Sequence, residues 1–143
     1  MHSPPKKLRS HSAYDSVARA ETSHMKGSSA ETYLANRLVC AGETILARNF
    51  RGRGFELDLL TMKQDVLIVV EVKYRSSYNR NNDLTQLVSS SKKKALKKGV
   101  LYWLSRNPDV ANKVTTIRLD LAVITQRGRQ LSNEYYRNID WDA

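Results

Sequence analysis

The stretch 66–74, Val-Leu-Ile-Val-Val-Glu-Val-Lys-Tyr, constrains the fold more than any other part of this sequence. A run so rich in Val and Ile is typical of a strand in the middle of a sheet, buried on both faces. The same run contains two charged residues, Glu71 and Lys73. Residues two apart on a strand point to the same side, so these two side chains share one face.

A second strand is predicted directly before this one, over 55–62, where apolar residues alternate with Glu56 and Asp58. The apolar face of this strand is expected to hold Phe55, Leu57 and Leu59. The polar stretch 63–65 supplies a hairpin turn between the two strands. Pairing across that turn places Asp58 close to Glu71 on one face of the sheet.

Two carboxylates and an ammonium group at the centre of a sheet need an explanation, because burying uncompensated charge is expensive. Two like charges about 4 Å apart repel by roughly 4 kcal/mol at an effective dielectric constant of 20. One interpretation is an ordinary ion pair of Lys73 with Glu71 or Asp58. The other is a divalent cation, Mg²⁺ or Mn²⁺, held by the carboxylates. We favour the metal site, because the aspartate lies on the preceding strand and the Glu-x-Lys motif lies inside a Val/Ile run.

These residues resemble the PD-(D/E)xK nuclease motif, with Asp58 as the first acid and residues 71–73 as the second half. Leu57 stands at the position of the motif's proline. Over about residues 26–140 the chain is more closely similar to the YraN-like family of small bacterial proteins, which in turn is similar to archaeal Holliday junction resolvases. The matching residues are Gly27, Glu31, Glu56-Leu57-Asp58, Val70–Arg75, Ser91-Lys92 and Arg118-Leu119-Asp120. Phe55 stands where the family usually has a glycine.

The predicted order of elements is one helix, three strands, one helix and two strands. This order indicates an α/β fold with a mixed sheet flanked by helices, as in the restriction-endonuclease-like fold that the resemblance implies. The resemblance also implies a metal-dependent DNA endonuclease that acts on branched or irregular DNA, such as Holliday junctions, in DNA recombination and repair. Resolvases of this fold are dimers, which favours a homodimer. The alternative is a nucleic-acid-binding module of the same fold with weak or no catalysis.

In the mechanism that the resemblance implies, Asp58 and Glu71 hold Mg²⁺ or Mn²⁺, with the Val72 carbonyl as a further oxygen. Lys73 orients the attacking water or helps to deprotonate it. Glu56 is a hydrogen-bonding partner of this set or a ligand of a second metal ion. Asp120 also matches a family acid, and we expect an outer hydrogen bond or a surface position for it rather than direct metal ligation.

The first predicted helix begins with a capping box, in which Ser28 is the N-cap and Glu31 the third helical residue, and it ends at Gly42. Glu31 therefore has two interpretations of equal weight. It caps the helix, or it is the helical glutamate that resolvases add to their catalytic metal cluster. The two roles can coexist.

The charge balance indicates a polyanionic partner, since 24 Lys and Arg against 14 Asp and Glu give a net charge of +10. Five lysines lie in the first turns of the second predicted helix, 89–106, where they oppose the helix dipole. Lysines on a helix face are usually only solvated, but beside the Ser-capped amides of this helix we favour phosphate binding for them. Arg51 and Arg53 flank the glycines of a predicted turn. Such arginines are commonly solvated, and the alternative is that they contact phosphate. The candidate nucleic-acid-binding residues are Arg51, Arg53, Arg75, Arg80, Lys92, Lys93, Lys94 and Lys97.

Residues 1–26 lack periodicity and are expected to form a flexible basic tail, followed by a single nuclease-like domain over 27–143. The chain has a single cysteine, so it cannot form a disulfide within itself. Because no histidine follows residue 24, the predicted domain also lacks the histidine that Ser/His or Cys/His catalysis requires. No apolar run approaches the length of a membrane span. We therefore expect a cytoplasmic protein with no membrane partner.

Overall fold

The structure is a computed structural model that describes residues 7–10, 26–75 and 87–142. Its elements are β1 (Lys7–Ser10), α2 (Lys26–Cys40), β2 (Thr44–Gly52), β3 (Phe55–Lys63), β4 (Val66–Arg75), α4 (Ser90–Ser105), α5 (Pro108–Ala111), β5 (Thr116–Arg127) and β6 (Gln130–Ile139). Among the described helices, none is both long and apolar enough to span a membrane.

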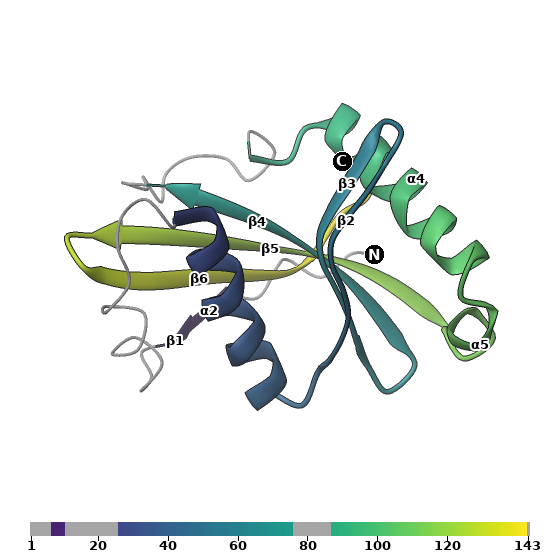
Figure 1. Ribbon diagram of the computed structural model, residues 1–143, viewed down its shortest axis with the longest axis horizontal. Coiled ribbons are helices and arrows are strands. Elements are labelled where there is room, and N and C mark those ends of the chain that lie inside the picture. The colour runs from purple at the N-terminus through teal and green to yellow at the C-terminus, as the bar shows by residue number, and fades with distance from the viewer. Residues whose placement is uncertain (1–6, 11–25, 76–86, 143) are drawn as a thin grey trace.

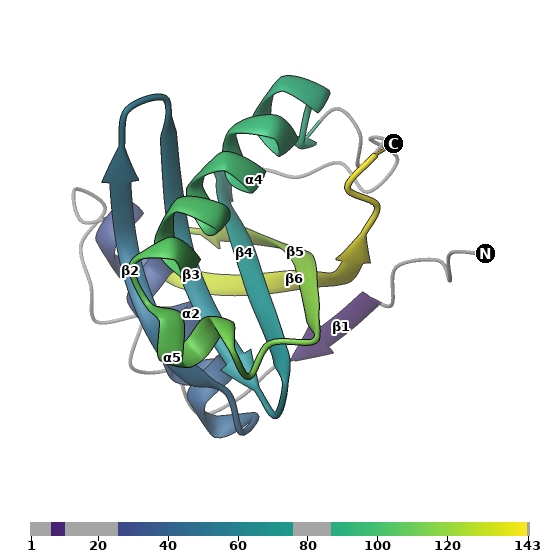
Figure 2. The ribbon, with the colours of Figure 1, turned by 90° about the vertical axis from the view of Figure 1, so that its right-hand side faces the viewer.

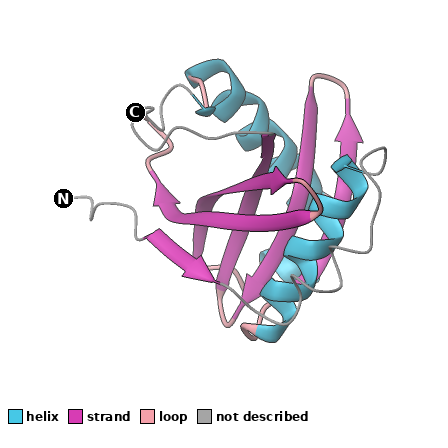
Figure 3. Cartoon of the chain, turned by 90° about the vertical axis from the view of Figure 1, so that its left-hand side faces the viewer, coloured by secondary structure: helices cyan, strands magenta, loops and turns pink. Residues whose placement is uncertain are grey.

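The strands form one six-stranded sheet in the order β1-β6-β5-β4-β3-β2. Strands β4 and β5 run parallel, and every other neighbouring pair is antiparallel. Helix α4 lies in front of the sheet in Figure 2 and helix α2 lies in front of it in Figure 3, so the two helices cover opposite faces. The predicted α/β fold, a mixed sheet flanked by helices, is confirmed.

Strand β4 is the central element of the core, as the Val/Ile run predicts. Its residues 67–70 are completely buried. Leu67 and Val69 pack in the cluster beneath α4, whereas Ile68 and Val70 pack in the cluster beneath α2. This alternation places the odd-numbered residues of β4 on the face that α4 covers.

Strand β3 bends at Asp58, so its predicted alternation is wrong in part. Leu57 and Leu60 both pack beneath α4, although residues three apart on a regular strand point to opposite faces. Leu59 packs beneath α2 instead. In the β2–β3 ladder the register places Asn49 opposite Asp58, and Asn49 has the left-handed φ of 50°. This local irregularity lies where the β2–β3 hairpin separates from β4, a feature that no periodic pattern encodes.

The capping signals in the sequence predict three of the four ends of α2 and α4 and fail at the start of α2. The Ser89 side chain caps α4 by accepting a hydrogen bond from the Lys92 amide at 3.2 Å, and Arg106 is the C-cap, as predicted. Helix α2 ends before Gly42, which has a φ of 92°. The predicted N-cap is wrong, because α2 begins at Lys26 and Ser28 therefore lies inside the first turn. A capping box is a local signal, and it does not exclude a helical conformation for the residues before it.

The segment 7–10 forms β1, an antiparallel edge strand that pairs with β6. The sequence predicts a flexible tail here, so the structure differs from the prediction for these four residues. An edge strand pairs through backbone groups and needs no apolar alternation, which explains why the pattern gave no signal. The predictions for the other residues before 26 lie outside the described residues.

Candidate active site

Asp58 and Glu71 lie opposite each other at the point where β3 and β4 separate. The β3–β4 ladder runs outward from the turn to the pair Leu59 and Val70, and the next residue on each strand is one of the two acids. Figure 1 shows the upper ends of β2 and β3 standing apart from the arrowhead of β4. The predicted hairpin, which turns at Gln64, thus brings the two acids together.

Where the strands separate, the Asp58 side chain accepts the hydrogen bond that a backbone carbonyl of β3 would accept in a regular ladder. The Val72 amide donates a hydrogen bond to Asp58 Oδ2 at 2.8 Å. The N–H and C=O groups of one strand residue point to the same edge of the strand, so the Val72 carbonyl also faces this opening. Three oxygen-bearing groups, two carboxylates and one carbonyl, are therefore neighbours there.

The Glu71 side chain is buried on the α4 face of the sheet and is only 2% exposed. The ammonium groups of Lys73 and Lys92 each lie 3.4 Å from Glu71 Oε2. Neither contact has the geometry of a hydrogen bond, and Oε2 has no hydrogen-bond partner among the described residues. Buried carboxylate oxygens usually make at least one hydrogen bond, so Oε2 is an acceptor left open.

The pKa of Asp58 rises from 3.8 to about 7, first because the group is buried, then because its protonated form donates a hydrogen bond to Glu71, and then because the Glu71 charge repels its ionised form. The Val72 amide and Lys92 oppose this rise without cancelling it. At neutral pH the acid pair therefore retains a proton for part of the time. A bound cation would replace that proton, because it compensates the same repulsion.

The donor set fits Mg²⁺ or Mn²⁺. Among the described residues, no group of three or more His, Cys, Asp or Glu side chains is placed to hold a metal ion. Zinc sites of the structural or catalytic kind need three or four protein ligands. Mg²⁺ is often bound through one or two carboxylates, with water and substrate phosphate completing its shell, so a pair of acids with an open oxygen suits this ion.

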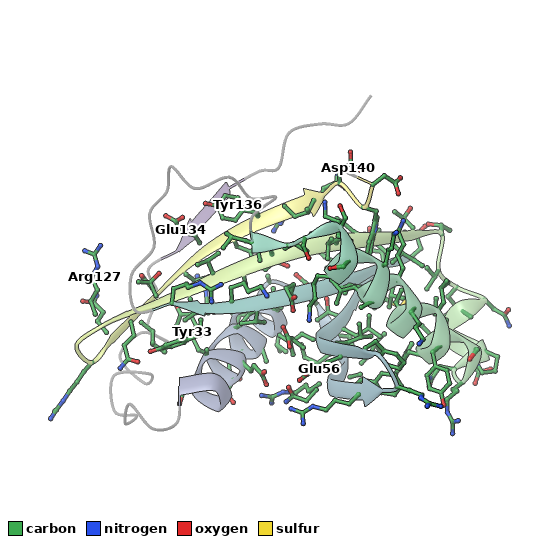
Figure 4. The ribbon with its side chains drawn as sticks, turned by 90° about the horizontal axis from the view of Figure 1, so that it is seen from above. Tyr33, Glu56, Arg127, Glu134, Tyr136 and Asp140 are labelled. Atoms are coloured by element: carbon green, nitrogen blue, oxygen red, sulfur yellow. The ribbon has the colours of Figure 1, made fainter. Side chains whose placement is uncertain are left out.

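Two further predicted acids stand apart from this pair. The Glu56 carboxylate accepts a hydrogen bond from Arg51 Nε at 3.1 Å, and its side chain is half exposed on β3. Figure 4 shows Glu56 well separated from Arg127 at the β5–β6 hairpin. Glu31 is part of α2, which covers the face of the sheet opposite to the one on which Glu71 lies. The structure therefore does not join Glu31 or Glu56 to the acid pair.

The predicted phosphate-binding lysines separate into different environments. Lys92 contacts Glu71, a role that the sequence did not reveal. Lys93 is only 2% exposed, so its prediction as a nucleic-acid-binding residue is wrong. It lies on the buried stripe of α4 with Leu96 and Val100, a spacing that the sequence already displays. Lys94 is exposed.

The remaining predicted cations lie on the surface or outside the described residues. Lys97 forms an ion pair with Asp142 at 2.9 Å. Arg75 is exposed and donates a hydrogen bond to the Tyr74 carbonyl. Arg53 is exposed in the β2–β3 turn. Arg80 lies outside the described residues.

Asp120 is a buried structural acid and not a surface residue. It accepts hydrogen bonds from Arg118 Nε and Nη2 at 2.9 Å each, from Tyr135 Oη at 2.5 Å and from the Asn138 amide at 2.9 Å. It pairs with Val70 in the β4–β5 ladder, which places it on the α2 face, away from Glu71. The predicted surface position of Asp120 is therefore wrong, and its hydrogen bonds join Arg118, Tyr135 and Asn138 rather than the acid pair, so the predicted outer hydrogen bond to the metal site is not found either.

Asp58→Asn should raise the stability of the metal-free protein above pH 7 and reduce its dependence on pH. Between pH 3.8 and about 7 the folded chain keeps a proton on Asp58 that the unfolded chain has lost, so the free energy of unfolding falls as the pH rises. The fall should amount to about 1–3 kcal/mol and should be absent in the variant, whose amide oxygen still accepts from Val72.

Urea unfolding at pH 5 and pH 8 in EDTA measures this difference. Asp109→Asn is the matched control, because Asp109 is exposed on α5 and should leave the dependence on pH unchanged. An equal fall in stability in the wild-type and Asp58→Asn proteins would show that Asp58 does not hold the proton.

Comparison with known proteins identifies the family. The model of the uncharacterised protein family UPF0102 matches residues 30–124, a stretch that contains the acid pair and the two lysines that contact Glu71, Lys73 and Lys92. A UPF0102 protein of Trichlorobacter lovleyi is 37% identical over 115 residues, 78% of this chain and 87% of the relative. One of Dinoroseobacter shibae is 33% identical over 112 residues, 78% of this chain and 80% of the relative. One of Aliivibrio fischeri is 34% identical over 89 residues, 62% of this chain and 71% of the relative. The chain therefore belongs to family UPF0102, the YraN-like family that its sequence motifs indicate.

Proposed function

We propose that this protein is a divalent-metal-dependent endonuclease that hydrolyses phosphodiester bonds in branched or irregular DNA. The observation that carries the proposal is the buried acid pair, in which Asp58 has its pKa raised to about 7 and Glu71 Oε2 has no hydrogen-bond partner among the described residues. A purely structural ion pair would be expected to satisfy that oxygen. Strongly perturbed carboxyl groups beside lysines are typical of functional sites.

Asp58, Glu71 and the Val72 carbonyl are the groups that would hold Mg²⁺ or Mn²⁺. When bound, such an ion lowers the pKa of a coordinated water and acts as a Lewis acid toward the phosphate. The protein contributes the fixed positions of the acids, because Asp58 is held by the Val72 amide and Glu71 by the buried centre of β4. Acids that are already in place need no reorganisation during the reaction.

Lys73 and Lys92 supply positive charge where the phosphate develops negative charge. Both ammonium groups lie 3.4 Å from Glu71 Oε2, and both side chains are partly exposed, so substrate can reach them. Lys73 orients the attacking water through its N–H groups, and Lys92 attracts the phosphate from the first turn of α4. The Ser89-capped start of α4 adds backbone amides to this phosphate site.

DNA is the proposed partner because the net charge of +10 favours a polyanion, and a homodimer would present two such sites to a symmetric junction. The fold and the charge alone leave room for a second candidate function. A nucleic-acid-binding module that has little or no catalytic activity would have the same fold and charge.

Cleavage of a panel of DNA substrates distinguishes the two functions. The panel consists of a four-way junction, a flap, a single strand and a plain duplex, each incubated in Mg²⁺, Mn²⁺ or EDTA. We expect cutting in either metal and not in EDTA, with the branched substrates cut faster than the duplex. If the junction is bound but is cut in neither metal, the protein is a binding module and the endonuclease proposal fails.

A further inference from the structure

A partly exposed aromatic cluster lies where the β2–β3 hairpin meets α4, apart from the acid pair. Its members are Phe50, Phe55 and Tyr102, which we call the aromatic platform. The ring centroids are 5.6 Å apart for Phe50 and Phe55, 6.1 Å for Phe50 and Tyr102, and 5.6 Å for Phe55 and Tyr102. Figure 2 shows β2 and β3 running beneath α4. Tyr102 is 45% exposed, so a large apolar ring faces solvent on a rigid helix.

Two glycines make room for the platform. A Cβ atom on Gly52 would lie 2.2 Å from Phe55 Cζ, and one on Gly99 would lie 2.8 Å from Phe55 Cδ2. Phe55 thus fills a space that only glycines at these two positions leave open. Because its ring is buried in that space, it fixes the inner side of Tyr102, and the exposed ring is held in place.

The surroundings of the platform are basic. Residues 94, 98, 102 and 106 are all exposed and lie four apart, so Lys94, Lys98, Tyr102 and Arg106 form one stripe along α4. The Arg106 guanidinium lies 5.7 Å from the centroid of the Tyr102 ring and donates a hydrogen bond to Tyr102 Oη at 3.2 Å. Residues 94–106 contain no acid, and the one acid among residues 50–56, Glu56, is paired with Arg51.

This combination of charge and rings selects the partner. A second copy of the chain would bring like charges together, which opposes its docking here. A hydrophobic peptide would leave the cations of the stripe without partners. A single nucleic-acid strand satisfies both features, because its phosphates pair with the cations and its bases stack on aromatic and guanidinium planes.

We propose that the aromatic platform binds an unpaired base of a DNA strand whose phosphates follow the basic stripe of α4. The inference rests on the proposed function and narrows its substrate class to DNA with a single-stranded segment beside the scissile bond. Tyr102 lies ten positions after Lys92, which contacts the acid pair. At a rise of 1.5 Å per residue, the bound base therefore lies about 15 Å along the helix from the site of hydrolysis.

Binding of two oligomers tests the platform without requiring cleavage. One is a fluorescent thymidine oligomer of about 15 nucleotides, and the other is an abasic oligomer of equal length and charge. Dissociation constants are measured by anisotropy in EDTA. Tyr102→Ala should weaken binding of the thymidine oligomer about tenfold and leave binding of the abasic oligomer nearly unchanged. Tyr102→Phe should bind both oligomers as the wild type does.

Leu101→Ala is the matched control, because Leu101 is the adjacent exposed apolar residue on α4 and lies outside the platform. It should bind the thymidine oligomer as the wild type does. If Tyr102→Ala lowers the affinity for both oligomers equally, or for neither, the proposed binding of a base by the platform is overturned. Loss of a dimer in Tyr102→Ala with unchanged DNA binding would assign the surface to a second copy and would also overturn it. Because the assay contains EDTA, its result does not depend on whether the acid pair supports cleavage.

Discussion

Glu71→Gln should lower metal-dependent DNA cleavage about a thousandfold while leaving DNA binding nearly unchanged. The amide keeps the size and shape of the buried side chain but removes the negative charge that attracts the cation. Metal-ion stabilisation of a transition state amounts to several kcal/mol, and about 4 kcal/mol corresponds to a thousandfold in rate. Binding should persist because the net charge of +10 and the basic surface of α4 remain.

Single-turnover cleavage of a branched substrate in Mn²⁺ measures the rate, and anisotropy in EDTA measures binding. Glu56→Gln is the matched control, because Glu56 lies on the same strand as Asp58 but stands apart from the acid pair and is paired with Arg51. Its rate should stay within about threefold of wild type, the size of effect expected for an exposed ion pair. A cleavage rate in Glu71→Gln equal to that of the wild type would remove Glu71 from the mechanism.

Asp120→Asn should lower the free energy of unfolding by about 3–5 kcal/mol, because removing one partner of a buried ion pair leaves the other charge uncompensated. Asp120 is completely buried, and Arg118 donates two hydrogen bonds to it. The Tyr135 hydroxyl also depends on this carboxylate, and burial together with the Asp120 charge raises the pKa of Tyr135.

Urea unfolding at pH 7 gives the free energies for this comparison. Tyr135→Phe removes one hydrogen bond but keeps the ion pair, so it should lower the stability by only about 1–2 kcal/mol. Any Asp120→Asn protein that remains folded should show the same thermal stabilisation by Mn²⁺ that we expect for the wild type, since Asp120 lies on the other face of the sheet from Glu71. A loss of the metal response in folded Asp120→Asn would mean that Asp120 acts on the site.

The parts of the fold that the sequence predicts well are those governed by local chemistry. The Val/Ile run locates β4, and the Ser89 cap locates the start of α4. The pairing of Asp58 with Glu71 was predictable because both strands lead away from one short turn. The burial of Lys93 was also visible in the sequence, as a lysine at an apolar position of the α4 stripe.

The remaining features depend on contacts that are distant in sequence. The bend of β3 at Asp58 coincides with the left-handed conformation of Asn49 on the neighbouring strand. The partners of Asp120 come partly from β6, through Tyr135 and Asn138, and no spacing indicates them. The aromatic platform joins a hairpin to a helix about fifty residues later, so neither segment reveals it alone.

Titration of Mn²⁺ into the wild-type and Asp58→Asn proteins tests most directly the claim that the acid pair is a divalent-cation site. Calorimetry at pH 6 in buffers of different ionisation enthalpy measures both the binding and the protons released. Because the pKa of Asp58 is about 7, the wild type should bind Mn²⁺ with release of nearly one proton per ion, and the variant should bind weakly without that release. Equal Mn²⁺ binding and equal proton release in the two proteins would contradict the assignment of the acid pair as the metal site.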